Sequence, residues 1–539
     1  MPAEADVLVV GAGPVGLTLA HELCRHGVRV RLIDAADGPA TTSRAIATHP
    51  RTLETFDQMG LVHRIIARGQ VISGFTVYQE GRKLIRLDAD YRTMPTRFPF
   101  TVAVEQTATE AVLREALAER NIAPEWGVRL DTIRSGADRV TAQLTHRDGT
   151  VEHYSTPWLV GCDGGHSTVR KTLGVPLTGR ANQTWLLADA PLDTDLPRDS
   201  IYWVRTEEAT VMAVPLRTEG RWRLLDTADT DSDPRAVRDR FSRKLSRGTG
   251  TVVRVGEPAW ISVFTAQQRM VSRMRVGRCL LAGDAAHVHS PASGQGMNTG
   301  IQEAVNLAWK LAMVVHRAAR PELLDTYSEE RVPIGRKLLG SAKRATNFVE
   351  LRSPVADRVL PVMFRAVRTF PPLRRRLQAK ILGGISGLQL SYRDSGLTTS
   401  TGQHANPVPG QRFAQVGGQH ACSPGWASVL RELRDPRWLL LAAPGPDGSN
   451  LGFLNPVADD HRSWLAVRVV ARTDGRSGIA DTIADPDGVL TQTTGLSRGG
   501  WLLVRPDGYV AARGSHAHPD AIDRALADVP LAGLGAGKA

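Results

Sequence analysis

One strand–turn–helix–strand unit near the start of the chain constrains its fold more than any other feature. An apolar run, a glycine turn, a stretch with helical spacing and a second apolar run follow one another at residues 6–10, 11–16, 17–26 and 29–34. The turn has the sequence Gly11-Ala12-Gly13-Pro14-Val15-Gly16, which matches Gly-x-Gly-x-x-Gly. In such a turn Gly11 permits the tight bend, Gly13 lets a pyrophosphate approach the backbone, and Gly16 lets the helix pack closely. Asp34 suits the ribose hydroxyls of an unphosphorylated adenosine, so the unit predicts an α/β fold that binds FAD or NAD rather than NADP.

A second glycine-rich stretch, residues 283–300, joins a predicted buried strand at 279–282 to an amphipathic helix. The apolar positions of that helix recur with helical spacing at Ile301, Ala304, Val305, Ala308, Trp309, Ala312 and Val315. Gly294, Gly296 and Gly300 allow the backbone to approach a flat ligand, and the amides that open the helix favour an anion. A reduced flavin ring is such a ligand, and an ordinary buried turn is the alternative.

A third strand, glycine turn and helix follow one another at residues 158–170. The structural interpretation is an Asp163-Gly164 turn with Ser167 near the start of the helix. The passage repeats the arrangement of the other two, so it adds weight to a nucleotide-binding fold.

The rest of the chain divides into parts by composition and periodicity. Residues 71–104 and 184–265 are strand-rich, a helix is expected to begin at Gln106, and residues 319–395 are helical with interrupting prolines. A segment rich in Thr, Ser, Gly and Pro, 396–412, marks a boundary, and the apolar strands beyond it predict a small α/β domain. The expected domains are a discontinuous FAD-binding domain at 1–180 and 266–395, a substrate-domain sheet at 181–265 with strands from 71–104, and a C-terminal domain at 396–539.

Composition excludes several classes of protein. The net charge of +12 comes from arginines scattered along the chain, so no nucleic-acid partner is expected. The four cysteines form no Cys-x-x-Cys pair, which argues against a disulfide framework and a zinc site. There is no apolar run of about 18 residues and no secretory signal at the N-terminus, so we expect a cytoplasmic protein without a membrane partner.

Three motifs together resemble a known family, the single-component FAD-dependent aromatic hydroxylases of the para-hydroxybenzoate hydroxylase type, and more narrowly the bacterial aromatic polyketide hydroxylases. In chain order they are Gly11-x-Gly13-x-x-Gly16, Asp163-Gly164 with Ser167 and Arg170, and Gly283-Asp284 followed by Pro291 and Gly294-Gln295-Gly296-Met297-Asn298. Ser293 stands where the family pattern has glycine, which is expected to narrow the loop above the flavin. The resemblance covers nearly the whole chain.

The resemblance implies a fold and a set of FAD contacts. The fold is a Rossmann-like FAD-binding domain with an inserted, mostly antiparallel substrate sheet and a thioredoxin-like C-terminal domain. No cysteine pair follows the strand that ends at Ala442, so thiol exchange is excluded there and a packing or assembly role remains. The expected FAD contacts are Gly11, Gly13, Pro14, Val15, Gly16, Asp34, Arg44, Gln106, Asp163, Asp284, Pro291, Gly296, Met297 and Asn298.

The resemblance also implies a role for several of these residues. By motif, Asp34 binds the adenosine ribose and Arg44 the pyrophosphate, while Gln106 and Asp284 bind the ribityl region. Asp163 is expected to order backbone rather than touch the pyrophosphate. Met297 and Asn298 are expected to present backbone amides to the flavin ring. Pro291 is expected to lie over one face of that ring.

The activity implied is reduction of FAD by NADPH and reaction with O2 to a C4a-hydroperoxyflavin, which transfers one oxygen atom to a polycyclic aromatic substrate. Neither a nucleophile nor a metal is expected. No residue is identified as a catalytic base; His49, His287 and His289 lie in or near the cofactor motifs, where a structural role is the more common one. Whether the chain is a monomer or a homodimer stays open.

Three other functions are compatible with parts of the pattern. Baeyer–Villiger oxygen insertion beside a ketone shares the cofactor and the motifs. A flavin reductase or dehydrogenase would satisfy the first glycine turn equally well. The weakest alternative is a C-terminal binding module on an inactive flavoprotein.

Overall fold

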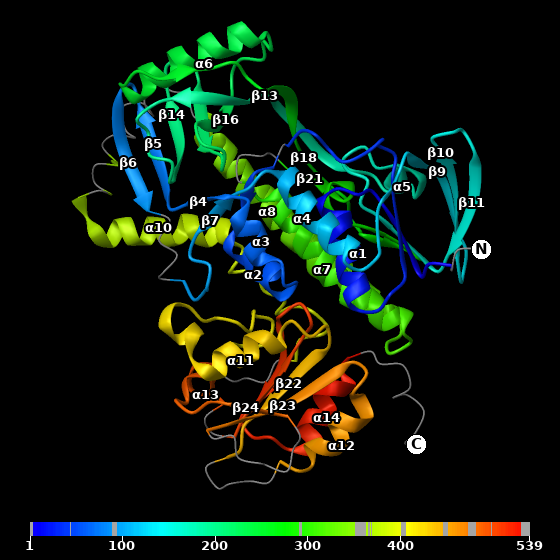
Figure 1. The fold of residues 1–539 in the computed structure, drawn as a ribbon. Coiled ribbons are helices and arrows are strands. Elements are labelled where there is room, and N and C mark those ends of the chain that lie inside the picture. Colours follow the sequence, from blue (N-terminus) through cyan, green and yellow to red (C-terminus); the bar gives the residue numbers. More distant parts are fainter. Residues whose placement is uncertain are drawn as a thin grey trace.

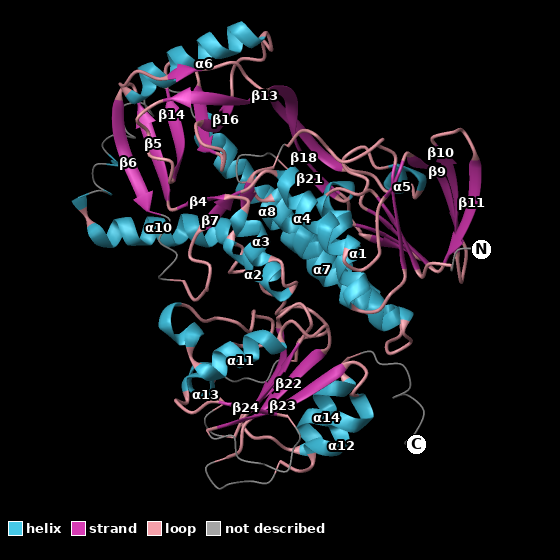
Figure 2. Cartoon of the chain, viewed as in Figure 1, coloured by secondary structure: helices cyan, strands magenta, loops and turns pink. Residues whose placement is uncertain are grey.

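The computed structural model describes residues 4–529 except 44, 89–93, 290–293, 351–362, 365–366, 368, 400–405, 446–450, 473–480 and 497–498. The chain has the mixed α/β fold expected from the sequence, with a larger part that holds several sheets and a smaller sheet formed within about its last quarter (Figure 1; Figure 2). None of the helices formed by the described residues has the length and apolar composition that crossing a membrane requires.

A six-stranded sheet carries the three glycine-containing stretches predicted at residues 6–34, 158–170 and 283–300, here called the glycine passages. Its strands, in spatial order, are β19 (Arg275–Val276), β20 (Cys279–Leu281), β12 (Trp158–Gly161), β1 (Val7–Val10), β2 (Val30–Asp34) and β8 (Glu125–Trp126). All neighbours are parallel except β19 and β20. Val10 is paired with Gly161, and Gly161 with Leu281, so β1, β12 and β20 end at the same edge. Parallel pairing therefore brings the three glycine turns together, although they lie far apart in the sequence.

The helices of the larger part, other than the one described below with the second sheet, are distributed over its several sheets. They are α1 (Pro14–Arg25), α2 (Pro50–Gln58), α3 (Val62–Ala67), α4 (Gln106–Ala118), α5 (Thr168–Thr172), η2 (Gly283–Ala285), α7 (Gly296–Val315), η4 (Pro321–Leu324), α8 (Asp325–Glu350) and α10 (Pro371–Ser386). The expected helix start at Gln106 is confirmed. Pro333 lies inside α8 instead of ending it, which differs from the interruption expected at the prolines.

A nine-stranded sheet forms a second layer. Its strands, in order, are β21 (His287–Val288), β18 (Trp260–Met270), β13 (Thr178–Asp193), β16 (Arg221–Asp226), β15 (Thr210–Pro215), β14 (Ser200–Arg205), β5 (Gly74–Gln79) and β6 (Arg82–Asp88), with β17 (Arg254–Val255) on β13. β5 joins β14 in parallel, so the segment at 71–104 contributes to this sheet. The helix α6 (Pro234–Thr249) was not predicted, although Val237, Phe241 and Leu245 repeat every four residues and are buried.

Two small sheets complete the larger part. One contains β9 (Val128–Ser135), β10 (Val140–His146) and β11 (Val151–Thr156), and the other contains β3 (Ala47–Thr48), β7 (Thr101–Ala103) and β4 (Gln70–Ile72).

The last part of the chain, here called the C-terminal unit, is a five-stranded sheet flanked by helices. Its strands, in order, are β24 (Thr482–Ala484), β23 (Leu465–Ala471), β22 (Trp438–Ala442), β25 (Trp501–Val504) and β26 (Val510–Gly514), with η5 (Gly418–Cys422), α11 (Pro424–Glu432), α12 (Leu454–His461), α13 (Val489–Thr494) and α14 (Pro519–Ala527). The turn sequence Pro506-Asp507-Gly508 favours a hairpin. β25 and β26 form that hairpin on either side of it. One apolar core runs from the six-stranded sheet into this unit, where Trp438 meets Trp309 of α7 edge to face with ring centroids 5.3 Å apart.

Candidate functional site

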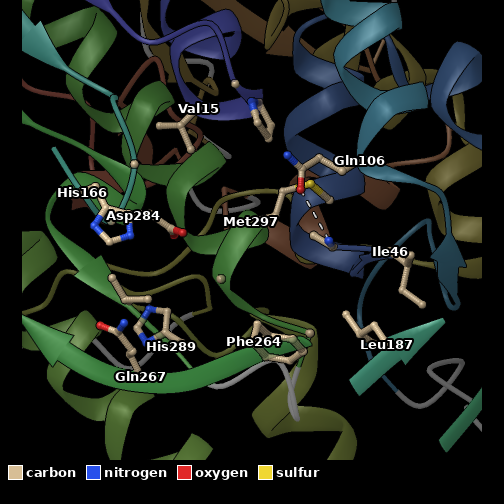
Figure 3. Close-up of a pocket in the computed structure, with 18 of the residues that line it drawn as sticks. Val15, Ile46, Gln106, His166, Leu187, Phe264, Gln267, Asp284, His289 and Met297 are labelled. Carbon is tan, nitrogen blue, oxygen red and sulfur yellow. Dashed lines mark hydrogen bonds between the residues drawn. The ribbon is translucent and has the colours of Figure 1, made fainter. Parts of the chain in front are cut away.

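A cavity of about 770 Å³ lies where the three glycine passages meet the nine-stranded sheet. Figure 3 shows Val15, Asp284, Met297 and Gln106 around one part of it, with Phe264 and Leu187 beyond Met297. The volume is in the range of small-molecule and cofactor sites. The turn after β1 and the loop that precedes α7 are in direct contact, because a Cβ built on Gly283 would lie 2.8 Å from Cγ2 of Val15. Residues of all three glycine passages, including Gly13, Gly164 and Gly294, therefore converge on one cavity.

The first glycine turn has room for a ligand on one side and none on the other. A Cβ at Gly11, where φ is +104°, would lie 2.4 Å from the carbonyl oxygen of Cys162, and one at Gly16 would lie 1.9 Å from the Gly11 oxygen. A Cβ at Gly13 would meet no protein atom within 4 Å. Gly13 lines the cavity next to the start of α1, so this cradle fits the pyrophosphate of a dinucleotide.

Asp34 ends β2 and fixes the backbone around the turn. Its carboxylate accepts hydrogen bonds from the amides of Ala12 at 2.7 Å and Ala36 at 2.8 Å. A carboxylate has further lone pairs, so these bonds are compatible with the predicted acceptance of ribose hydroxyls.

Asp163 orders backbone, as expected. Its carboxylate accepts hydrogen bonds from Ser167 Oγ at 2.5 Å and from the amides of Thr168 at 2.7 Å and Val169 at 3.1 Å. Burial raises its pKa and outweighs these hydrogen bonds, which lower it. Ser167 caps α5 by accepting a hydrogen bond from the Arg170 amide.

Arg170 joins two of the glycine passages. Its guanidinium donates to the carbonyl oxygen of Gly165 at 3.1 Å and to that of Ala285, beside Asp284, at 3.2 Å. Because Arg170 also lines the cavity, it holds the walls together at the point where an anionic ligand would lie.

The other predicted contacts differ in where the structure places them. Gln106, Asp284, Gly296 and Met297 line the cavity with Gly13, Pro14 and Val15, whereas Arg44 and Pro291, like Ser293, lie outside the described residues. Asn298 is buried and does not line the cavity; its side chain accepts from the His49 amide at 2.9 Å and donates to the oxygens of Ala47 and Gly294. Asn298 thus ties the start of α7 to β3 with its side chain, a role that the motif did not predict.

A buried acid–base cluster lies under the loop before α7. Glu303 accepts hydrogen bonds from the Gly283 amide at 3.0 Å and from His287 Nε2 at 2.7 Å, and an Arg331 nitrogen lies 3.7 Å away. Burial lowers the pKa of His287, but the Glu303 carboxylate outweighs it and raises that pKa above the usual 6.5. Burial raises the pKa of Glu303, yet the charges of His287 and Arg331 lower it below 4.5. His287 is therefore structural, as expected, while His289 lines the cavity.

This cluster predicts a pH-dependent stability. The raised pKa of His287 contributes stability that is present below pH 6.5 and is lost as pH rises through the raised value. Replacing Glu303 by glutamine is expected to cost about 3–5 kcal/mol near pH 6, since it leaves buried charges without their partner. The difference from the parent shrinks at higher pH. Thermal unfolding from about pH 5.5 to pH 9 measures this, with the exposed Glu329→Gln as the control, and a pH-independent difference contradicts it.

The part of the cavity formed by β13, β15, β16 and Phe264 of β18 has one cation among apolar side chains. Leu187, Met212, Leu225 and Phe264 line it, and Arg223 lies among them. Arg223 is 1% exposed and donates from Nε and Nη2 to the two carboxylate oxygens of Asp189, both at 2.7 Å. The sequence analysis missed Arg223. The available signal was a single arginine within the apolar strand 222–225.

The charges around the cavity favour anionic ligands. Asp284 is acidic, and the basic side chains among the described lining residues are Arg170, Lys171, Arg223 and Arg269. A pyrophosphate, a reduced flavin or a phenolate would each be attracted to such a lining.

Comparison with known proteins gives a consistent result. Residues 4–342 match the family model described as FAD binding domain. The chain is 51% identical over 520 residues to 6-methylpretetramide 4-monooxygenase of Streptomyces rimosus, covering 95% of this chain and 92% of that protein. It is 31% identical to pentachlorophenol 4-monooxygenase of Sphingobium chlorophenolicum, covering 97% and 96%. Among solved structures, the OxyS anhydrotetracycline hydroxylase from Streptomyces rimosus aligns with a TM-score of 0.72 at 29% identity, covering 98% of this chain and 99% of that chain.

Proposed function

Because the chain belongs to the family of FAD-dependent monooxygenases, we propose that it hydroxylates a polycyclic aromatic compound of the polyketide type, with NADPH and O2 as co-substrates. The observation that carries the proposal is that the glycine passages and an apolar wall of the nine-stranded sheet line the same cavity. The names of the relatives, which include a pretetramide monooxygenase and an anhydrotetracycline hydroxylase, support a polycyclic substrate.

The proposal assigns each segment of the chain to a domain with its own role. Residues 1–180 and 266–395 form the FAD-binding domain, 181–265 with strands from 71–104 form the substrate sheet, and 396–539 form a thioredoxin-like domain. The FAD contacts are those of the motifs: Gly11, Gly13, Pro14, Val15, Gly16, Asp34, Arg44, Gln106, Asp284, Pro291, Gly296 and Met297. Asp163 and Asn298 act on the same site by fixing the backbone of its loops.

The chemistry that FAD supplies when bound is acceptance of electrons from NADPH and activation of O2. The residues of this chain bind, orient and exclude water. Leu187, Met212, Leu225 and Phe264 present apolar surface to a flat substrate, which keeps water away from its ring. Arg223, held by Asp189, faces the same space as a fixed positive charge, so it stabilises a substrate oxygen in its anionic, more electron-rich form.

The test follows NADPH and product together. Purified protein is incubated with NADPH, O2 and a panel of polycyclic phenols and quinones, and the expected result is NADPH consumption matched by a product one oxygen atom heavier. A product that opens in base identifies a lactone and favours Baeyer–Villiger insertion. NADPH consumption without any oxygenated product contradicts a monooxygenase and favours a reductase.

A further inference from the structure

The C-terminal unit is joined to the larger part by a buried ionic cluster. Glu330 of α8 accepts hydrogen bonds from Arg505 Nη1 at 2.6 Å and Nη2 at 2.9 Å, across the boundary between the two parts. It also accepts from Lys310 Nζ at 2.7 Å, Asn306 Nδ2 at 2.8 Å and Ser395 Oγ at 2.6 Å. All five side chains are buried. Four of them donate to one carboxylate, so their relative positions are closely specified.

Tyr392 extends this contact toward the loop at 283–289, which precedes α7. The Arg505 guanidinium lies 4.7 Å from the centroid of the Tyr392 ring, and the Tyr509 ring of the C-terminal unit lies 4.5 Å from the same ring. The Tyr392 hydroxyl accepts a hydrogen bond from Arg331 Nη1 at 3.0 Å. Arg331 in turn donates from Nη2 to the carbonyl oxygen of Thr299, in the first turn of α7, at 3.1 Å.

Arg331 completes the route to the cavity wall. Its guanidinium nitrogen lies 3.7 Å from Glu303, whose other oxygen accepts the Gly283 amide at 3.0 Å. Gly283 directly precedes Asp284, which lines the cavity. An unbroken series of contacts thus leads from Arg505 to the loop that precedes α7, with Tyr392 as the junction between the two parts.

We propose that Tyr392 and Arg331 are positioning residues through which the C-terminal unit holds the loop at 283–289 and the start of α7 in the arrangement that binds FAD. Replacing a buried ion cluster by apolar side chains of similar volume is often neutral or stabilising, and in several proteins buried charges instead specify one geometry. Dithiol–disulfide exchange within the unit offers no competing role, since its sequence contains only one cysteine, Cys422. The inference rests on FAD binding and does not depend on the substrate.

The test removes one hydroxyl from the full-length protein. Tyr392→Phe keeps the ring and its stacking but leaves Arg331 Nη1 without this acceptor. We expect FAD to bind the stripped protein about threefold to tenfold more weakly, as measured by flavin fluorescence titration without substrate. Tyr202→Phe is the matched control, because the Tyr202 hydroxyl donates to the Pro197 oxygen at 2.7 Å in the nine-stranded sheet and does not contact the series. The control is expected to lower the unfolding temperature without changing FAD affinity.

A second variant tests the same route from the other end. Arg505→Lys keeps the positive charge beside Glu330 but loses the planar contact with Tyr392, and it too is expected to weaken FAD binding, although Arg505 does not line the cavity. In the double variant the two losses are expected not to add, as for residues of one network. FAD affinity in Tyr392→Phe equal to that of Tyr202→Phe, or additive losses in the double variant, overturns the proposal. Because no substrate is present, these outcomes are independent of the hydroxylation test.

Discussion

Gly16→Ala is expected to prevent formation of a flavin-binding protein, whereas Gly13→Ala is expected to give a stably folded protein that binds FAD poorly. A Cβ at Gly16 would lie 1.9 Å from the Gly11 carbonyl oxygen, so α1 must move away from the end of β1. Backbone atoms cannot move aside as a flexible side chain can, and we expect destabilisation of about 3 kcal/mol or more.

Gly13→Ala is expected to weaken FAD binding without destabilising the fold. The Gly13 φ of −74° is ordinary for alanine, and a Cβ there meets no protein atom within 4 Å. The new methyl group would instead occupy space that the cavity offers to a pyrophosphate, so FAD affinity should fall by at least about tenfold, or about 1.4 kcal/mol.

Two measurements on Gly13→Ala and Gly16→Ala distinguish a loss of folding from a loss of FAD binding. Thermal unfolding of the stripped protein reports folding, and titration with FAD reports binding. Parent-like FAD affinity in Gly13→Ala would show that this turn does not hold the pyrophosphate, and parent-like stability in Gly16→Ala would contradict the packing of α1 on β1.

Arg223→Leu is expected to damage both stability and substrate binding. Asp189, 8% exposed, would keep a charge that has lost its bidentate partner, and breaking a buried ion pair in this way costs about 3–5 kcal/mol. Loss of the cation that faces the substrate space should also raise the KM for a phenolic substrate about 10-fold to 100-fold, the value of a hydrogen bond to a charged group.

The double variant Arg223→Leu with Asp189→Leu separates the two effects. Removing both charges leaves no uncompensated carboxylate, so stability should return close to that of the parent. Substrate affinity should stay low, because the cation is still missing. Recovery of KM together with stability would mean that Arg223 supports the fold only and does not bind substrate.

The sequence analysis succeeded where local chemistry determines local structure. Strand, turn and helix at the three glycine passages followed from apolar runs, glycine spacing and helical periodicity, and the hairpin of the C-terminal unit followed from Pro506-Asp507-Gly508. The helix α6 was missed because arginine-rich helical faces weaken the apolar pattern, and only three spaced apolar residues revealed it.

The site was predictable only in part. Residues in motifs, such as Gly13, Asp284 and Met297, line the cavity as a group. Arg223 and Tyr392 belong to no motif, and each acquires its significance from side chains distant in the sequence: Asp189 for the first and Arg331 for the second.

By itself the sequence determined that the chain contains a dinucleotide-binding unit, because the glycine turn, its flanking strands and helix, and Asp34 occur together. The resemblance of the three motifs to a known family then identified the dinucleotide as FAD. The three glycine turns meet because β1, β12 and β20 pair in parallel. This pairing joins segments that are distant in the sequence, and it depends on the packing of their buried faces. Tertiary structure likewise decided that the buried Arg223 lines the cavity, and that the C-terminal unit is connected to the start of α7 through Tyr392 and Arg331. Such contacts join residues whose separation along the chain carries no local signal.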